Sequence, residues 1–204
     1  MSTQPSAGAA MALLEGNQEI ATHGRAVARV AIRIAAAIGL DEPSQAQIGT
    51  AAGLHDIGKL PIPPETLAKP GPLTPDEWAQ VRLHPVLGEQ MLFGEGLGEI
   101  AGWVRCHHER PDGRGYPDGL TTRAIPLESR IIAVADAYDA MVSERPYSSA
   151  ISDSAAREEL LRAAGTQFDS NVVAAFLGLR FRRRSWRRTA RAGSAPAGAF
   201  HAVA

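Results

Sequence analysis

The sequence is poor in residues that cross-link a chain or anchor it in a membrane. Its 204 residues include one cysteine, Cys106, so no disulfide can form within the chain. We interpret this thiol as a small buried hydrophobic side chain, the alternative being a metal ligand beside His107. No apolar run of about 18 residues occurs, and the opening MSTQPSAGAA lacks a basic segment followed by an apolar one. The composition therefore disfavours export and membrane spanning, and it predicts a cytoplasmic protein.

Acidic residues are absent from the end of the sequence. Nothing after Leu179 is acidic, and the segment from Arg180 to Arg191 holds seven of the 21 basic residues. Residues 1–179 therefore carry 14 basic and 22 acidic groups, a net charge of −8, whereas the whole chain carries −1. An acidic body argues against a stable nucleic-acid complex and is typical of proteins whose carboxylates hold cations. We interpret residues 180–204 as a disordered basic tail, either a solvated arm or a contact for nucleic acid or acidic lipid.

Strand-like alternation of useful length is also absent, and the apolar residues recur with a helical period. The first predicted helix ends at Gly39, and the positions that share its main face are Glu19, His23, Val27, Val30, Ile34 and Ile38. Further helices are expected over residues 43–58, 75–88, 97–109, 127–143, 152–164 and 170–179. Six prolines make residues 59–78 an expected loop up to the helix cap at Thr74. The sequence therefore predicts an all-α fold in a single domain.

Five of the six histidines lie on this helical body, and several have a carboxylate nearby. The candidate ligands are Glu19, His23, His55, Asp56, His84, His107, His108 and Asp136. A single histidine on an apolar face is more often a hydrogen-bonded core residue than a ligand. Five such residues on one body favour a metal cluster instead. Imidazole and carboxylate without thiolate suit iron, manganese, nickel or zinc.

Neighbouring positions on a helix suggest how this cluster is divided. Adjacent helical residues point about 100° apart, so we expect His107 and His108 to serve different ions, and likewise His55 and Asp56. A carboxylate has two oxygens and can bridge two ions about 3.5–4 Å apart, the usual separation in two-metal hydrolases. Asp56 is the candidate bridge. Glu19 heads an otherwise apolar stripe and is expected to face inward towards a cation, the alternative being a helix-start carboxylate that favours the dipole.

Four segments together resemble the HD-GYP domain of bacterial cyclic di-GMP phosphodiesterases. They read GLHDIGKLPIPPETLAKPGPLTPDEWAQVRLHPVLGEQML, HHERPDGRGYPDGL, IPLESRIIAVADAYDAMVSERPY and AGTQFDSNVVAAFL, and the match spans roughly residues 13–178. The His-Asp pair is shared by the wide superfamily of HD-type metal phosphohydrolases, whereas HHE followed by DGxGYP is specific to this branch. The resemblance implies an all-helical HD-type domain over residues 13–179 with an ordered glycine-rich GYP loop, after a flexible N-terminus of residues 1–12.

The resemblance also implies roles for individual residues. Metal would be ligated by His23, His55, Asp56, His84, His107, His108 and Asp136, with Glu19 at the place used by members that hold a third metal. Lys59 would meet a phosphate oxygen and act in catalysis together with Asp56. Tyr116 would line the nucleotide pocket, and Arg145 would fork onto a phosphate. A role in core or helix packing is the alternative for Tyr116 and for Asp139.

The implied activity is hydrolysis of cyclic di-GMP to linear pGpG or to GMP. Two or three divalent metals, iron or manganese, would activate a water as hydroxide for in-line attack on phosphorus. By the same resemblance, the GYP loop would also be a docking surface for diguanylate cyclase (GGDEF) partners.

Two positions depart from the family pattern and leave other functions open. Ser148 stands where many members have a basic residue, and Gly16-Asn17 replaces a common Arg-Asp. Substrate preference could therefore differ, and the first alternative is a phosphohydrolase for another cyclic dinucleotide or nucleotide. The others are an inactive module that binds partners through the GYP loop, and a di-iron oxygenase on the same helical scaffold.

Overall fold

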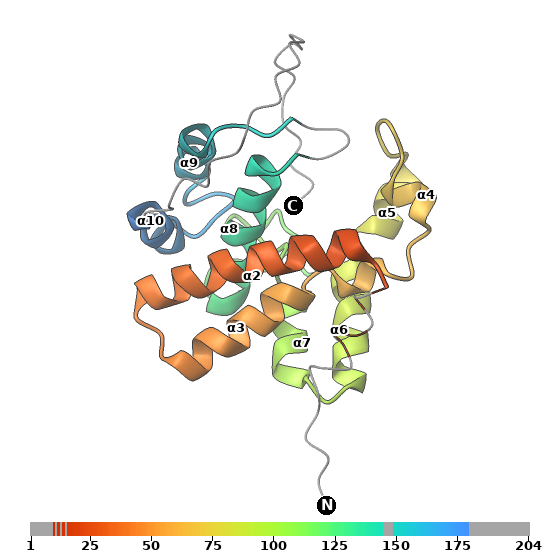
Figure 1. Cartoon of the computed structure of the whole chain (residues 1–204), viewed down its shortest axis with the longest axis horizontal. Coiled ribbons are helices and arrows are strands. Elements are labelled where there is room, and N and C mark those ends of the chain that lie inside the picture. Colours follow the sequence, from red (N-terminus) through yellow and green to blue (C-terminus); the bar gives the residue numbers. More distant parts are fainter. Residues whose placement is uncertain (1–9, 11, 13, 15, 145–148, 180–204) are drawn as a thin grey trace, which may run out of the picture.

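The computed structural model describes residues 10, 12, 14, 16–144 and 149–179, and this part of the chain is helical (Figure 1). Its α-helices are α2 (Gln18–Ile38), α3 (Glu42–Leu54), α4 (Pro64–Leu67), α5 (Pro75–Val81), α6 (His84–Gly94), α7 (Gly98–Arg105), α8 (Leu127–Val142), α9 (Asp153–Arg162) and α10 (Ser170–Gly178). One 3-10 turn, η1 (Ile57–Lys59), follows α3. The described residues form no β-strand, only two isolated bridges. The all-α prediction is confirmed.

The first helix begins and ends where its sequence signals place it. The side chain of Asn17 accepts a hydrogen bond from the backbone N–H of Ile20 and caps α2 at its start. At the other end Gly39 adopts the left-handed conformation, with φ of 93°, and its N–H bonds back to the last turn. The expected end of this helix is therefore confirmed.

Four other expected limits are wrong. The helix expected over residues 43–58 ends at Leu54, and Gly58 lies in the 3-10 turn η1. The predicted helix over residues 75–88 is two helices, α5 and α6, because Pro85 lacks the N–H that would bond to the carbonyl of Val81. The helix expected to reach Glu109 ends at Arg105, so the histidine pair follows α7 in a turn. The proline-rich loop contains one helical turn, α4, whose first residue is a proline. The first three differences matter directly for the site.

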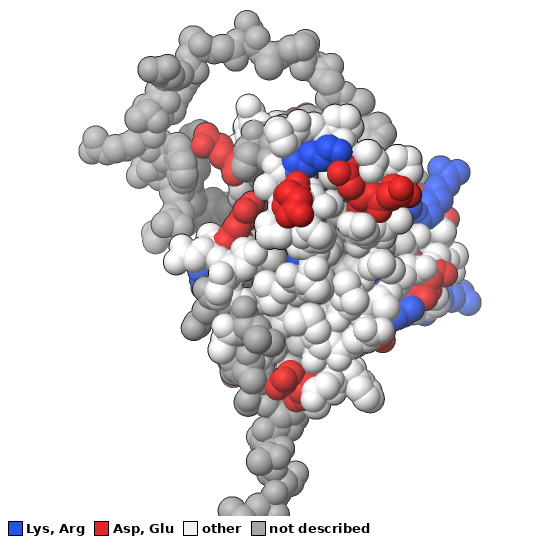
Figure 2. Space-filling model, turned by 90° about the vertical axis from the view of Figure 1, so that its right-hand side faces the viewer, with Lys and Arg blue, Asp and Glu red and all other residues white. Residues whose placement is uncertain are grey.

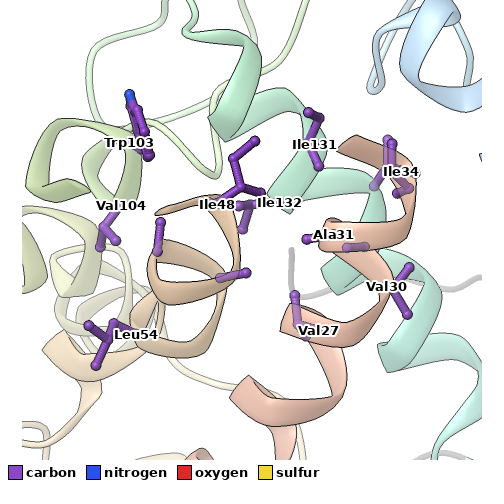
Figure 3. Close-up of a cluster of buried hydrophobic side chains, with 14 of the residues drawn as sticks. Val27, Val30, Ala31, Ile34, Ile48, Leu54, Trp103, Val104, Ile131 and Ile132 are labelled. Atoms are coloured by element: carbon purple, nitrogen blue, oxygen red, sulfur yellow. The ribbon is translucent and has the colours of Figure 1, made fainter. Parts of the chain in front are cut away.

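The apolar core lies where α2, α3 and α8 pack against one another (Figure 3). Val27 and Ile34 from α2 meet Ile48 from α3 and Ile132 from α8, all of them fully buried. Nearer the site, α2 crosses α3 so closely that a Cβ on Gly24 would collide with the carbonyl oxygen of Gly53. This crossing brings the end of α3 beside the part of α2 that carries His23.

The surface gives two further observations. On the face seen in Figure 2, acidic and basic side chains lie next to each other and form no patch of a single sign. None of the helices in the described part of the chain is both long and apolar enough to cross a membrane. The basic tail of residues 180–204 and residues 145–148 lie outside the described residues, so the expected domain limits stay a prediction.

Candidate metal centre

The predicted ligands come together where several helices end. His55 caps the end of α3 and Asp56 follows it, while His84 opens α6. His107 and His108 follow the end of α7, and His23 and Asp136 reach the same place from within α2 and α8. All of these side chains are buried except that of His23, which keeps 16% of its surface exposed. Residues up to 113 positions apart in the sequence therefore form one polar centre.

Two groups of ligand atoms can be distinguished in this centre. The first consists of His23, His55 and Asp56, and the second of His84, His107 and His108; within each group the ligand atoms lie within 4.8 Å of one another. Asp136 joins the first group, because its Oδ1 lies 2.9 Å from Nε2 of His23 and 3.8 Å from Nε2 of His55. In the second group, Nε2 of His84 lies 3.3 Å from Nε2 of His107 and 3.1 Å from Nε2 of His108.

Asp56 lies between the two groups. Its Oδ1 is 3.4 Å from Nε2 of His84, in the second group. Its Oδ2 is 3.5 Å from Nε2 of His55 and 4.0 Å from Nε2 of His23, in the first group. A carboxylate with one oxygen towards each group has the geometry of a bridging ligand in a two-metal site.

The helical geometry behind the expectation that adjacent residues serve different ions is wrong, whereas the ion that each residue serves stays a prediction. His107 and His108 both approach His84, and His55 and Asp56 share the first group. The reason is that neither pair lies on a helix: α3 ends at Leu54 and α7 ends at Arg105. Beyond a helix end the backbone no longer turns by about 100° per residue, so neighbouring side chains can converge.

Hydrogen bonds to the other ring nitrogen aim each histidine at the centre. Nδ1 of His55 lies 2.8 Å from the carbonyl oxygen of Ala52, and Nδ1 of His107 contacts the carbonyl oxygen of Val104 in the same way. Nδ1 of His84 lies 2.7 Å from the carbonyl oxygen of Val81, the acceptor that Pro85 leaves without a helical N–H. These bonds favour the tautomer with Nε2 free, as in histidines that ligate metals.

Burial keeps the second group uncharged. It lowers the pKa of His107 and of His108 well below the usual value, and it lowers the pKa of His84 to about 4 despite the attraction of Asp56. A neutral imidazole has a lone pair available for a cation. Near neutral pH this group is therefore ready to bind metal without first losing protons.

Ionic contacts hold the first group together. Burial opposes the charge on His23, but its hydrogen bonds to Asp136 and Asp139 raise its pKa to about 10. Burial also opposes ionisation of Asp56, yet nearby Lys59 and His55 bring its pKa well below the usual range. Burial also opposes ionisation of Asp136, yet the hydrogen bond from His23 and the nearby histidines lower its pKa, so both carboxylates of the centre are ionised at neutral pH, as ligation requires.

Two buried atoms in the centre lack any hydrogen-bond partner in the described structure: Nε2 of His55 and Oδ1 of Asp56. A buried polar atom without a partner costs about 1–3 kcal/mol, and such atoms are rare. A nitrogen lone pair and a carboxylate oxygen are both donors for a divalent cation. The centre therefore fits two divalent metal ions better than it fits a purely structural hydrogen-bond network.

Lys59 and Tyr116 lie at the edge of the centre. The ammonium of Lys59 is 2.8 Å from Oδ2 of Asp56, and its side chain is 22% exposed. The ring of Tyr116 stacks on His108, with ring centres 4.8 Å apart and an angle of 25° between the planes. Both residues are where a substrate-contacting residue is expected, although the assignment of these roles stays a prediction.

Glu19 differs from its expectation. It lies in the first turn of α2, as the sequence predicts, but its side chain is exposed and belongs to neither group. The expectation that it faces inward is therefore wrong, because the first turn of α2 buries Ile20 and Ala21 and leaves Glu19 on its solvent side. Ligation of a third metal by Glu19 stays a prediction. Arg145 and Ser148 lie outside the described residues.

The sequence did not predict the role of two carboxylates that position other groups of the site. Asp139, one turn after Asp136, holds Nδ1 of His23 at 2.8 Å. Glu109 is buried after the histidine pair and accepts hydrogen bonds from three backbone N–H groups of the loop, at Asp118, Gly119 and Leu120. For Asp139 the signal was its spacing from Asp136 on one helix face. For Glu109 it was a carboxylate placed directly before a glycine-rich turn.

The fold and the centre together define a helical protein with a paired His/Asp metal site. The chain belongs to the HD domain family, whose sequence profile matches residues 9–172, and it falls in the HD-GYP branch that its motifs indicated. The prediction of this family is confirmed.

Curated relatives support the same branch. The chain is 44% identical over 154 residues to the cyclic di-GMP phosphodiesterase response regulator RpfG of Xanthomonas campestris, covering 74% of this chain and 41% of the relative. It is 42% identical over 169 residues to a cyclic di-GMP phosphodiesterase of Thermotoga maritima, covering 80% and 45%. A 3'3'-cGAMP-specific phosphodiesterase 2 of Vibrio cholerae is 37% identical over 77% of this chain and 31% of the relative. The chain thus spans less than half the length of these relatives.

Solved structures support the fold. The HDG"Y"P protein Bd1817 of Bdellovibrio bacteriovorus superposes with a TM-score of 0.64 at 20% identity, covering 77% of this chain and 51% of that one. The PgpH HD domain of L. monocytogenes in complex with cyclic-di-AMP gives a TM-score of 0.56 at 18% identity, covering 87% and 99%. At these identities the likeness establishes the helical architecture alone.

Proposed function

We propose that the chain is a metal-dependent phosphodiesterase that opens a cyclic dinucleotide, with cyclic di-GMP as its first substrate. The observation that carries the proposal is the position of Asp56, which presents one oxygen to each of two ligand groups. The partnerless Nε2 of His55 beside it points to a cation in the same place. Three relatives whose names specify phosphodiesterases for cyclic dinucleotides support the substrate class.

The residues of the chain would divide the work as follows. His23, His55 and Asp136 hold one position and His84, His107 and His108 the other, with Asp56 between them. Divalent metals bound there would supply a Lewis acid for the phosphoryl oxygens and would lower the pKa of an attacking water to about 7. The backbone carbonyls behind the histidines, with Asp139 behind His23, keep this geometry fixed during turnover.

Lys59 would stabilise the negative charge on the phosphoryl oxygens. Its ammonium already lies 2.8 Å from Asp56 at the partly exposed edge of the centre. A phosphate oxygen that approaches Asp56 therefore comes within reach of the same ammonium. The ring of Tyr116, which covers His108, would form the wall on which the nucleotide rests.

Iron or manganese is our proposal for the metals, because imidazole and carboxylate ligands without thiolate suit both. A second candidate substrate is 3'3'-cGAMP, since a relative 37% identical is named as specific for it. Ser148, in place of a basic residue, is the sequence feature that would change the preference between cyclic dinucleotides. The cytoplasmic location and the docking of diguanylate cyclases on the GYP loop stay predictions from the sequence.

One experiment tests the activity and the substrate together. The purified protein, loaded with manganese or with ferrous iron without oxygen, is incubated with cyclic di-GMP, 3'3'-cGAMP and cyclic di-AMP. Chromatography then separates pGpG, GMP and the other products. We expect cyclic di-GMP to be opened fastest, and His55→Ala to open none. Elemental analysis should find at least two metal ions per chain. Fewer than one ion after loading, or intact nucleotides throughout, would disprove the proposal.

A further inference from the structure

Beside the metal centre, the side chain of Arg82 lies against two aromatic rings. Arg82, immediately after α5, places its guanidinium carbon 5.2 Å from the ring centre of Tyr116 and 6.0 Å from that of Trp78. Both distances fall within the range in which a cation is attracted to a ring face. Attraction to the two rings restricts the guanidinium, so less freedom is lost when it binds a ligand.

Tyr116 links Arg82 to the predicted metal ligands. The ring of Tyr116 stacks on His108 and also contacts the ring of His84. Arg82 lies only two residues before His84 in the chain. Arg82 is thus separated from the second ligand group by one aromatic ring. A substrate that is larger than a single phosphodiester and extends past Tyr116 would therefore come within reach of Arg82.

Arg82 lacks the usual neutralising partner. Among the described residues, other arginines near the loops and helix ends form ion pairs with carboxylates, as Arg105 does with Asp118 and Arg130 with Asp169. No ion pair or hydrogen bond from the Arg82 guanidinium to a described carboxylate is present, and the side chain is exposed. Its N–H groups are therefore available to an anion that approaches from solvent.

We propose that Arg82 binds the second phosphate of the cyclic dinucleotide, the one that is not being cut, and thereby selects two-phosphate substrates over simple phosphodiesters. This inference rests on the proposed function. A cyclic dinucleotide carries two phosphodiester groups, and only one can occupy the metals and Lys59 at a time. A guanidinium that lies over a ring keeps its N–H groups for other partners, and these form forked hydrogen bonds to phosphate.

The test compares two substrates that differ in their second phosphate. Cyclic di-GMP has two phosphates, whereas bis(p-nitrophenyl) phosphate has one and needs the metal centre alone. For Arg82→Gln we expect KM for cyclic di-GMP to rise about tenfold or more, the loss expected for a charge-assisted hydrogen bond. Turnover of bis(p-nitrophenyl) phosphate should stay as in the wild type. Arg82→Lys keeps the charge without the fork and should lie between the two.

Arg29→Gln is the matched control, because Arg29 is also an exposed arginine but lies on α2 and is outside both ligand groups. It should leave both substrates unaffected. Metal content and thermal unfolding of each variant show whether the centre and the fold are intact.

Each outcome decides the inference. An unchanged KM for cyclic di-GMP in Arg82→Gln would overturn it while leaving the proposed function in place. Equal losses on both substrates would also overturn it, since they would place Arg82 in support of the metal centre. A wild-type protein that cleaves only bis(p-nitrophenyl) phosphate would refute the proposed function, and the role of Arg82 with it.

Discussion

The protein buries two regions of opposite chemistry side by side. In the apolar region, Ile34, Ile48 and Ile132 are fully buried against one another (Figure 3). In the polar region, His55 and Asp56 are almost as buried, at 1% and 4% exposure, and one atom of each lacks a partner. Burial stabilises the first region by about 25 cal/mol per Å² of apolar surface and destabilises the second unless cations are present. The comparison indicates that the apolar region maintains the fold while the polar region is kept for function.

Asp56→Asn should produce the largest effect on the polar region and almost none on the fold. The amide keeps the size of the side chain but loses the charge that faces both ligand groups. We expect hydrolysis to fall by about three orders of magnitude, equivalent to about 4 kcal/mol of transition-state stabilisation. Circular dichroism should report an unchanged helix content. Near wild-type turnover with full metal content would show that Asp56 is not the bridge.

Ile132→Ala makes the converse change in the apolar region. Ile132 is fully buried, so the cavity should cost about 2–5 kcal/mol in the free energy of unfolding. Metal content and KM measured well below the melting temperature should stay unchanged, because Ile132 belongs to neither ligand group. Leu161→Ala is the control: Leu161 is 60% exposed, and its loss should cost less than about 0.5 kcal/mol. Urea unfolding measures both, and equal costs would invalidate the division into two regions.

Glu109→Gln probes the loop that covers the polar region. Its carboxylate accepts hydrogen bonds of 2.6, 3.1 and 2.8 Å from three successive backbone N–H groups. An amide accepts fewer, weaker bonds and puts a donor against the loop, which should cost about 1–3 kcal/mol. We expect Tyr116 to shift, turnover to fall about tenfold and metal content to be retained. Glu158→Gln, at an exposed position of α9, is the control. Unaltered turnover would show that the loop holds its place without Glu109.

The sequence predicted the helices and the ligand set but not the geometry that joins them. The apolar period and the helix end at Gly39 are local signals, so the end of α2 was placed correctly. The helix break before Pro85 decides where His84 points, and it depends on a single missing N–H. The turn after Arg105 decides where His107 points, and it depends on the early end of α7. The resemblance to HD-GYP domains indicated which residues come together in the metal centre. Helical spacing alone would have divided the adjacent histidines between ions.

The exposure of Glu19 and the support from Glu109 could not be predicted for a different reason. Glu19 shares a helix face with His23, but whether that face is still covered one turn earlier depends on elements distant in sequence. The hydrogen bonds of Glu109 depend on the backbone path of residues 118–120, which no periodicity describes. Long-range packing therefore decides the features that the sequence missed.

Asp169 is a buried carboxylate whose partners are all supplied by the protein, so its contribution to stability can be compared with that of the metal centre. Burial raises its pKa, but Arg130 at 2.6 Å and two backbone N–H groups more than offset this and lower it. A lowered pKa means stabilisation that is present above the unfolded value of about 3.9 and is lost as the pH falls through the folded value. Asp169→Asn should therefore cost about 1–2 kcal/mol at pH 7 and progressively less below about pH 4. Urea unfolding across this range checks it, and a cost independent of pH would contradict the charge-based account.

Glu19→Gln should have the smallest effect, and it sharpens the boundary of the polar region. Glu19 lies one helical turn before His23 on α2, so its carboxylate can approach the side of the first ligand group that faces solvent. Because it is exposed, an ion that it helped to hold would be hydrated, weakly bound and the first to leave. We expect the variant to contain about one metal ion fewer after mild chelation, while the pair beside Asp56 and most of the turnover remain. Glu42→Gln, in the first turn of α3, is the control for a helix-start charge. Equal metal content in Glu19→Gln and the wild type under the same chelation would assign Glu19 to the helix start and leave a two-metal site.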